Sequence, residues 1–502
     1  MHDIPLSCSL PVLLIFLYMT FRRLSSSRMK LPPGPRPVLF LGNALQIPST
    51  SPQFTFTKWL EEYVFQQPML VLNTLESARD LLHKRSSIYS DRPKFVLLDE
   101  LMGWHNASTI VQYGPRFRRH RRFIQQTFNQ VAINELRAIQ EKQISYLLQD
   151  IIDKPEQTDD HLQRFSAGII MKVTYGADVK SINDPLVQIA HRAELLTIES
   201  GTPSATLVDY IPALKYLPTW ARKAALVKEA VDAMFNVPYE IVKSQMISGV
   251  VSPCMTSRLM ATCSPAGVNS LSSEDEEDIK RVVGTMHAVF SQTQCVLSTF
   301  ILAMVLHPQV FNKAQAEMNG VIAIDRLPNF EDRDSLPYLE SVIKEVCRWN
   351  VPVPLGLPHR LMDDDVYRDY HIPKGTTVVS NYFSSEVQLP AILQNCSQPQ
   401  LFRPERYLED PHLLDPREVI FGFGRRRCPG RHFADRNVWL VAASLVCSTI
   451  IGKAKDDAGR EITPEARFLD GFVRHPAEFP YSIKFRPEKM SALSNWNDAL
   501  ET

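Results

Sequence analysis

The strongest chemical signal in the sequence is a short segment built around one cysteine. It reads Phe421-Gly422-Phe423-Gly424-Arg425-Arg426-Arg427-Cys428-Pro429-Gly430. Gly424 permits the positive φ of a tight turn, and Pro429 can open a helix predicted over 431–446. Cys428 would then lie at a helix N-terminus, where the helix dipole and free amides stabilise a thiolate. Because a thiolate there is a metal ligand, the segment predicts a metal held by Cys428.

The residues around Cys428 fit the same interpretation. Arg426 can pair with a nearby carboxylate, and Phe421 can shield the sulfur and so tune a metal's potential. The alternative is an ordinary buried cysteine in a glycine-rich turn. The chain has 8 cysteines with no C-x-x-C spacing, which favours lone thiols in a reducing compartment over a disulfide framework.

The segment matches F-x-x-G-x-R-x-C-x-G, and on it the chain resembles the cytochromes P450, a family of haem-thiolate monooxygenases. Glu345-Val346-Cys347-Arg348 is similar to the family's E-x-x-R, and Pro404-Glu405-Arg406-Tyr407 to its P-E-R-F. Phe117 and Arg121 stand where the family has W-x-x-x-R. A Glu–Arg pair at this spacing is common on any helix. E-x-x-R therefore supports the resemblance only together with the other motifs. The cysteine segment and the residues after it are most similar to fungal members of the family, of the O-methylsterigmatocystin oxidoreductase type.

The resemblance implies a cofactor and a set of residues that hold it. The cofactor would be haem b, with Cys428 as the axial ligand of iron. The resemblance gives the remaining cofactor-binding residues as Arg121, Arg426, Phe421, Gly424, Gly430 and His359. The two arginines would pair with the haem propionates, and His359 would either join them or be a satisfied polar residue. Glu345, Arg348 and Arg406 would form a buried structural triad.

The family's distal motif, A-G-x-D-T-T, is altered in this chain. The corresponding stretch reads Val289-Phe290-Ser291-Gln292-Thr293-Gln294. Phe290 replaces glycine and Gln292 replaces the acid, so Thr293 and Gln292 are the remaining catalytic candidates. Because an amide cannot donate protons as a carboxylic acid does, and such steps contribute about 10² to 10⁴ in rate, we expect slow or uncoupled turnover. Thr293 could instead bond back to a helix carbonyl.

The resemblance also implies the substrate and the partners. The substrate would be a lipophilic small molecule that contacts Phe290, Val353, Leu355 and Phe472. Electrons would come from NADPH through an FAD- and FMN-containing cytochrome P450 reductase, with cytochrome b5 as a second candidate donor. Two rival functions remain: a peroxygenase, isomerase or dehydratase that needs no reductase, and a catalytically degenerate relic.

The ends of the chain predict an association with a membrane. Residues 1–23 contain a mostly apolar run, Ile4 to Phe21, followed by basic residues. This pattern predicts an N-terminal anchor in the endoplasmic reticulum membrane with the catalytic domain in the cytosol; a cleaved signal peptide is the alternative. A basic, proline-rich hinge follows over 24–37, then a catalytic domain over 38–490 and a polar tail over 491–502. With 55 Lys+Arg against 55 Asp+Glu, we expect no nucleic-acid partner.

The 502 residues predict one large, mainly α (α+β) domain with small β-sheets. Apolar residues recur at helical spacing from Asp278 to His307, which predicts one uninterrupted helix there. Residues 252–277 are expected to form the loop before it, and β-strands are expected near 68–73, 376–381 and 481–485. The chain is shorter than the family's pattern between 63 and 67, and 382–401 does not match it. Either the fold has diverged there, or the gene model has mistaken splice boundaries.

Overall fold

The computed structural model describes residues 68–200, 207–210, 212–289, 291–382 and 398–501, together with residues 32, 53, 55, 63 and 64. The expected anchor (1–23) lies outside the described residues, as does the hinge (24–37) except for Pro32. Most of the two irregular stretches, 65–67 and 383–397, and Phe290 also lie outside them.

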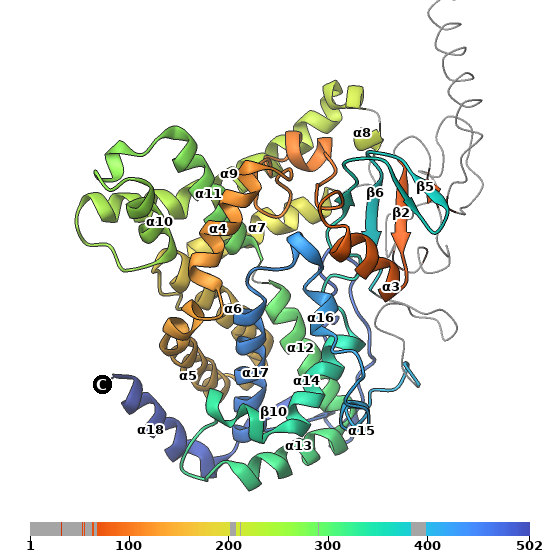
Figure 1. Ribbon diagram of the computed structural model, residues 1–502. Helices are drawn as coiled ribbons and strands as arrows, with labels where there is room; N and C mark the ends of the chain where they lie inside the picture. The colour runs from red at the N-terminus through yellow and green to blue at the C-terminus, as the bar shows by residue number, and fades with distance from the viewer. Residues whose placement is uncertain are drawn as a thin grey trace, which may run out of the picture.

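Helices make up most of the described chain (Figure 1). The α-helices are α3 (Leu75–Ala78), α4 (Pro115–Phe128), α5 (Arg137–Asp153), α6 (Thr158–Tyr175), α7 (Pro185–Glu199), α8 (Leu207–Tyr210), α9 (Pro218–Ile247), α10 (Met255–Cys263), α11 (Ser273–Ala288), α12 (Ser291–Leu306), α13 (Pro308–Val321), α14 (Pro337–Trp349), α15 (Arg406–Glu409), α16 (Arg417–Ile420), α17 (Arg431–Ser448) and α18 (Met490–Glu501). Shorter helical turns are η2 (Arg79–Lys84), η3 (Val96–Leu101), η4 (Ala132–Leu136), η5 (Pro155–Gln157), η6 (Pro212–Tyr216), η7 (Val268–Ser270), η8 (Phe330–Ser335), η9 (Gly424–Arg426) and η10 (Pro487–Lys489). The expectation of a mainly helical domain is confirmed.

The β-strands form small sheets. The largest has the order β1-β2-β6-β3, formed by β1 (Tyr63–Val64), β2 (Met69–Leu72), β6 (Thr377–Ser380) and β3 (His359–Arg360). Two-stranded pairs are β4 (Asp365–Tyr367) with β5 (Tyr370–Ile372), β7 (Thr449–Gly452) with β10 (Ser482–Phe485), and β8 (Ala454–Lys455) with β9 (Glu461–Ile462). The sheet with β2 and β6 lies to one side of the helices, whereas β7 and β10 pack against α5, α12 and α17 (Figure 1). The three strands expected from the sequence are confirmed as β2, β6 and β10.

The core is built around α17, the helix that follows the cysteine segment. Its residues from Val438 to Cys447 are apolar or small and almost entirely buried, as expected of a helix enclosed on all sides. Helices α5, α12, α13 and α14 pack against it, and Figure 1 shows α17 between α5 and α12. The C-terminal side of the cysteine segment is therefore anchored in the most rigid part of the molecule.

The prediction of one helix from Asp278 to His307 is wrong. Helix α11 ends at Ala288, and α12 begins at Ser291. The Val289 amide reaches only the Met286 carbonyl, at 3.5 Å, so the ladder of i to i−4 hydrogen bonds is interrupted. The break coincides with the altered distal motif.

Two other expected boundaries differ from the structure. The stretch 252–277, expected as a loop, contains α10 and the first turn of α11, where the Ser272 side chain accepts a hydrogen bond from the Asp275 amide. Residues 491–501, expected as a polar tail, belong to α18. Ala492 and Leu493 of this helix are buried and Trp496 packs against the main core. Three apolar residues among polar ones are enough to dock a terminal helix.

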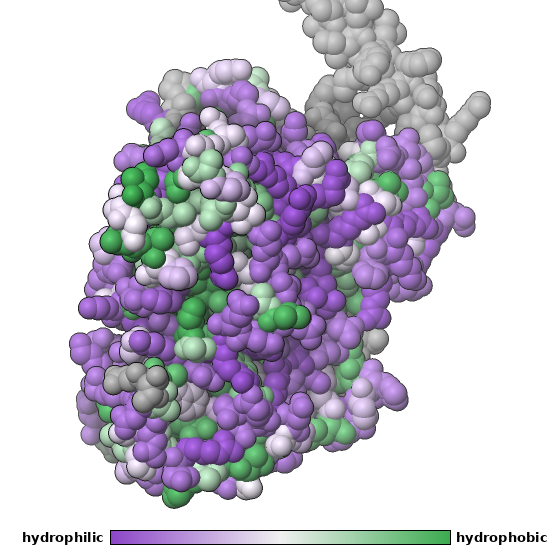
Figure 2. Space-filling model, turned by 60° about the vertical axis from the view of Figure 1, so that its left-hand side comes forward, coloured by the Kyte–Doolittle hydropathy of each residue, from purple (hydrophilic) through white to green (hydrophobic). Residues whose placement is uncertain are grey.

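Within the described residues, the length and apolar character of the helices give little evidence of a membrane-spanning segment. The one stretch there that is long and apolar enough to span a bilayer is Ser273–Leu306, and 76% of its most apolar 18-residue window is buried inside the protein. It is the core rod formed by α11 and α12. Polar side chains cover most of the face drawn in Figure 2, with apolar residues in scattered groups.

Candidate active site

The cysteine segment forms a tight loop between α16 and α17. The Cys428 amide donates to the Phe421 carbonyl at 2.8 Å, which closes the loop on itself. Gly422 and Gly424 have φ of 75° and 53°, in the region that favours glycine. A Cβ atom on Gly424 would lie 2.2 Å from the Leu82 carbonyl oxygen of η2, so this glycine also allows close backbone approach.

Gly424→Ala is expected to lower the melting temperature and to displace the loop, because the new methyl group meets both a left-handed φ and the backbone of η2. A cost of about 1–3 kcal/mol follows from the strain alone. Gly320→Ala in α13 is the matched control, since nothing lies within 4 Å of the added atom. Thermal unfolding of both variants measures the difference, and equal melting temperatures would contradict this assignment.

The Cys428 thiol is half-buried and free. Burial raises its pKa, while the Gly430 amide and the charges of Arg121 and Arg431 oppose that rise. The helix begins only at Arg431, so a single amide, that of Gly430, takes the place of the full helix terminus expected from the sequence. Because burial has the larger effect on the pKa of the thiol, a further cation next to the sulfur is needed to stabilise the thiolate.

Beside this loop, three arginines lie close together without a carboxylate partner among the described residues. Arg426 lies over the Phe117 ring, 3.8 Å from its centroid, and donates to the carbonyls of Ser90 (2.7 Å) and Val111 (2.6 Å). Its third nitrogen, Nη1, is buried with no hydrogen-bond partner. Burial and the neighbouring Arg92 lower the pKa of Arg426 to about 8. The side chain is thus positioned for an anion.

Arg92 is a member of this cluster that the sequence analysis missed. It is buried, and it donates to the carbonyls of Leu357 (2.6 Å), Pro358 (2.7 Å) and Thr109 (2.9 Å). Burial lowers its pKa to about 10. Arg92 belongs to none of the motifs described above. The sequence therefore offers no signal for its role beyond its position between Asp91 and Pro93. Arg121, on α4, donates to the Arg427 carbonyl at 2.6 Å and joins α4 to the loop.

His359 fits an anion less well than the arginines do. It is buried on β3, and its Nδ1 donates to the Tyr89 carbonyl at 2.7 Å. Burial and the charge of Arg92 lower its pKa well below the ordinary value. The neutral ring therefore presents Nε2 as an acceptor, which cannot bond a carboxylate.

The structure brings together the three residues expected as a triad. Arg348 donates to Glu345 through Nε and Nη2, both at 2.8 Å, and Arg406 Nε donates to the same carboxylate at 3.1 Å. All three side chains are at most 3% exposed. The arginines also hold the carbonyls of Gln398, Pro399 and Leu401, so the group fastens the segment before α15 to α14.

The distal candidates lie in the first turn of α12. Gln292 and Thr293 are half-buried, and neither side chain has a hydrogen-bond partner among the described residues. The alternative in which Thr293 bonds back to a helix carbonyl is not seen; Thr299 does so instead, to Cys295 at 2.7 Å. The Thr293 hydroxyl is therefore available to a ligand or water. Phe290, the third residue of interest, lies outside the described residues.

The segments that are expected to contact a substrate lie close together near α12. The Arg474 amide donates to the Pro352 carbonyl at 2.8 Å, and the Asn350 amide group donates to the Arg474 carbonyl and to Thr299 Oγ1, both at 2.9 Å. These bonds place the loops that carry Val353, Leu355 and Phe472 beside α12. Val353 and Leu355 are half-buried, while Phe472 is 41% exposed.

The donor set fits a haem better than a metal ion held by protein alone. Among the described residues, no three His, Cys, Asp or Glu side chains converge as metal ligands. A haem needs one axial thiolate, and its two propionates would supply the carboxylates that Arg426, Arg92 and Arg121 lack. The cluster offers one thiol and three cationic groups on neighbouring elements.

Comparison with known proteins agrees with the fold and this site. The family model described as cytochrome P450 matches residues 32–448, and the chain belongs to this family. Membership implies a haem bound through a cysteine thiolate and an enzyme that incorporates oxygen.

Relatives in fungi cover almost the full chain. Cytochrome P450 monooxygenase 176 of Postia placenta is 38% identical over 96% of this chain and 95% of its own. Cytochrome P450 monooxygenase 136 of the same fungus is 36% identical over 92% and 90%. Tryptamine 4-monooxygenase of Psilocybe cyanescens is 36% identical over 95% and 96%.

Proposed function

We propose that the protein is a haem b monooxygenase in which the Cys428 thiolate would hold the haem iron. One observation carries the assignment: a free, half-buried thiol lies in a loop of two left-handed glycines beside buried and half-buried arginines that have no carboxylate partner among the described residues. The haem, when bound, supplies the chemistry of activating dioxygen for insertion into a substrate bond.

The residues of the chain divide the remaining tasks between them. Arg426, Arg121 and Arg92 bind the propionates and orient the ring. Phe421, whose carbonyl accepts from the Cys428 amide, keeps the loop closed, and Gly424 allows its backbone to approach Leu82. An added Cβ at Gly430 would meet nothing within 4 Å, so this position does not require glycine for close approach. The Thr293 hydroxyl and the Gln292 amide, both unpaired within the described residues, hold water or substrate on the distal side.

We propose a lipophilic small molecule of fungal secondary metabolism as the substrate. Support comes from the half-buried Val353 and Leu355 beside α12 and from the relatives, one of whose names specifies tryptamine. We also propose that NADPH supplies electrons through a cytochrome P450 reductase or cytochrome b5. The membrane anchor over 1–23, placed in the endoplasmic reticulum with a cytosolic catalytic domain, is part of the same proposal.

A peroxygenase is the second candidate, because Gln292 replaces the acid expected in the distal motif. Purified protein should turn over a panel of lipophilic substrates with NADPH plus reductase, and more slowly than an enzyme with an acid at this position by about 10² or more. Gln292→Asp should raise that rate. Activity with hydrogen peroxide alone, unchanged by reductase, would overturn the monooxygenase assignment in favour of the peroxygenase.

A further inference from the structure

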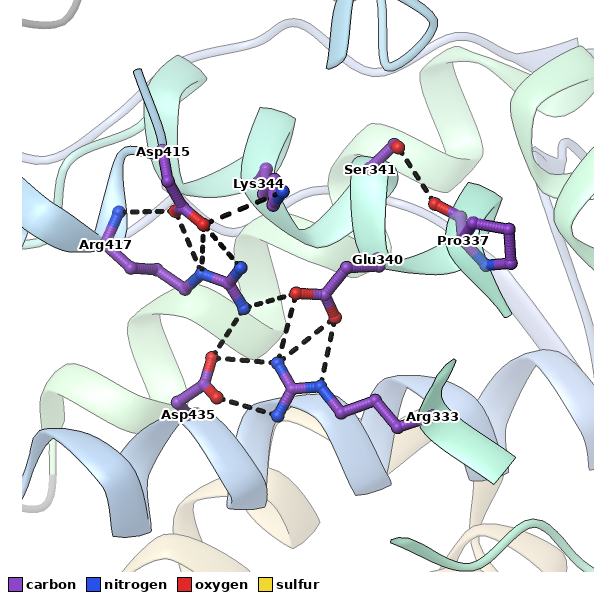
Figure 3. A network of polar contacts seen from close by, with 8 residues as sticks. All are labelled: Arg333, Pro337, Glu340, Ser341, Lys344, Asp415, Arg417 and Asp435. Carbon is purple, nitrogen blue, oxygen red and sulfur yellow. Dashed lines mark hydrogen bonds and ion pairs between the residues drawn. The ribbon is translucent and has the colours of Figure 1, made fainter. Parts of the chain in front are cut away.

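An ion network lies on the side of α14 that faces α16 and α17 (Figure 3). Its members are Arg333, Glu340, Lys344, Asp415, Arg417 and Asp435. They come from η8, α14, the turn before α16, α16 and α17. Their side chains are all 18–25% exposed, so water reaches the network only in part.

Arg417 is the centre of the network. Its Nη1 lies 2.6 Å from Glu340 Oε1 and 2.9 Å from Asp435 Oδ1, and its Nη2 lies 2.6 Å from Asp415 Oδ2. One guanidinium therefore joins three carboxylates from three separate segments, a geometry that Arg provides and Lys does not.

Arg333 joins the same partners from the opposite side. Its Nη1 lies 2.7 Å from Asp435 Oδ2, and its Nη2 lies 3.1 Å from Glu340 Oε2. Burial alone would raise the pKa of Asp435, but Arg333 and Arg417 outweigh it and hold that pKa below its ordinary value. Asp435 is thus ionised and bound on both of its oxygens at neutral pH.

The two ends of the cysteine loop meet in this network. Arg417 is the first residue of α16, just before the loop, and Asp435 lies in the second turn of α17, just after it. The two are 18 positions apart in sequence, with Cys428 between them. The loop itself carries three consecutive arginines, so the mutual repulsion of their charges acts to open it.

We propose that Arg417 and Asp435 are positioning residues for Cys428: together they close the cysteine loop and hold it against α14. This inference rests on the proposed function, because its consequence is the retention of the thiolate bond to haem iron. The network adds to the bonds of Arg121 and Arg426, which hold the loop to α4 and to the Ser90 and Val111 carbonyls.

The test uses the full chain with haem bound, as wild type, Arg417→Gln, Asp435→Asn, the double variant and Arg417→Lys. The first readout is the red-shifted Soret band of the reduced carbon monoxide complex, which reports thiolate ligation. At a temperature below unfolding, each single variant should lose this band roughly tenfold faster than wild type, because a destabilised loop opens more often. Because the residues act as a pair, the double variant should be little worse than either single one. Arg417→Lys should fall between.

The second readout is hydrogen exchange of the loop amides, including that of Cys428, which is bonded to Phe421 in the closed loop. Exchange should accelerate over 421–430 in the same variants. The matched control is Arg164→Gln, which removes a buried Arg–Asp pair between α5 and α6, 2.6 Å from Asp150. It should lower the melting temperature and leave both loop readouts unchanged.

Two results would overturn the inference. One is variants that keep the wild-type band lifetime and exchange rates; the other is an Arg164→Gln protein whose two loop readouts change as much as those of the Arg417 and Asp435 variants for the same fall in melting temperature. A wild-type protein that never shows the band would refute the proposed function instead. In that case the exchange rates of the loop still decide whether Arg417 and Asp435 close it.

Discussion

Cys428→Ala is expected to abolish the red-shifted Soret band and to leave little haem on the purified protein. The substitution removes the one sulfur in the loop that can bind iron. The neighbouring arginines could then bind the haem only through its propionates. Because a ligand that binds only the folded state stabilises it, the variant should also lose the rise in melting temperature that haem gives wild type. Absorption spectra and thermal unfolding, with and without added haem, measure both effects.

The control for this experiment is Cys263→Ser, which alters a partly buried free thiol at the end of α10, away from the loop. It should leave haem content and spectrum unchanged. A Cys428→Ala protein with the same band as wild type would rule out Cys428 as the ligand, and haem-free wild type would favour the degenerate relic.

Glu345→Gln is expected to have the largest effect on folding. The Glu345 carboxylate is fully buried and is shared by Arg348 and Arg406, so its loss leaves two buried cations without their common counter-charge. Breaking a buried ion group in this way costs about 3–5 kcal/mol, a large part of the about 5–15 kcal/mol by which a typical domain is stable. Soluble yield and denaturant unfolding should both fall sharply.

Glu331→Gln is the matched control. This residue pairs with Arg137 at 2.5 Å on the surface, where the two side chains are 62% and 41% exposed. Surface pairs contribute about 0–1 kcal/mol, so its unfolding curve should nearly overlay that of wild type. A Glu345→Gln protein as stable as this control would contradict the proposed structural role of the triad.

The sequence predicted the parts of the fold that depend on local pattern. Short β-like runs predicted β2, β6 and β10, and Gly424 indicated the positive φ of the turn seen in the structure. The helical period of apolar residues from 278 to 307 also correctly predicted a face of α11 and α12 that is buried in the core. It could not predict the break after Ala288, because periodicity continues in phase across a short interruption.

The parts that sequence reasoning missed depend on contacts between distant segments. Arg92 bonds carbonyls near residue 357, and Asp435 meets Arg333 and Arg417, none of which any local spacing reveals. The α18 helix was missed because its apolar residues are few and their burial depends on α5. His359 was assigned by resemblance, but the bond from Nδ1 to Tyr89 decides its chemistry.

The break at Val289 divides the interior of the molecule between two sets of neighbours. Before it, α11 packs against α9, α10, α4 and α7; after it, α12 packs against α14, α13 and α17, and α6 packs against both. Helices α7 and α9 therefore meet the core rod through α11, whereas α17, the helix that follows Cys428, meets it through α12. A substitution that disturbs the packing of α7 and α9 thus acts on the rod first at α11, and one that disturbs α17 acts first at α12.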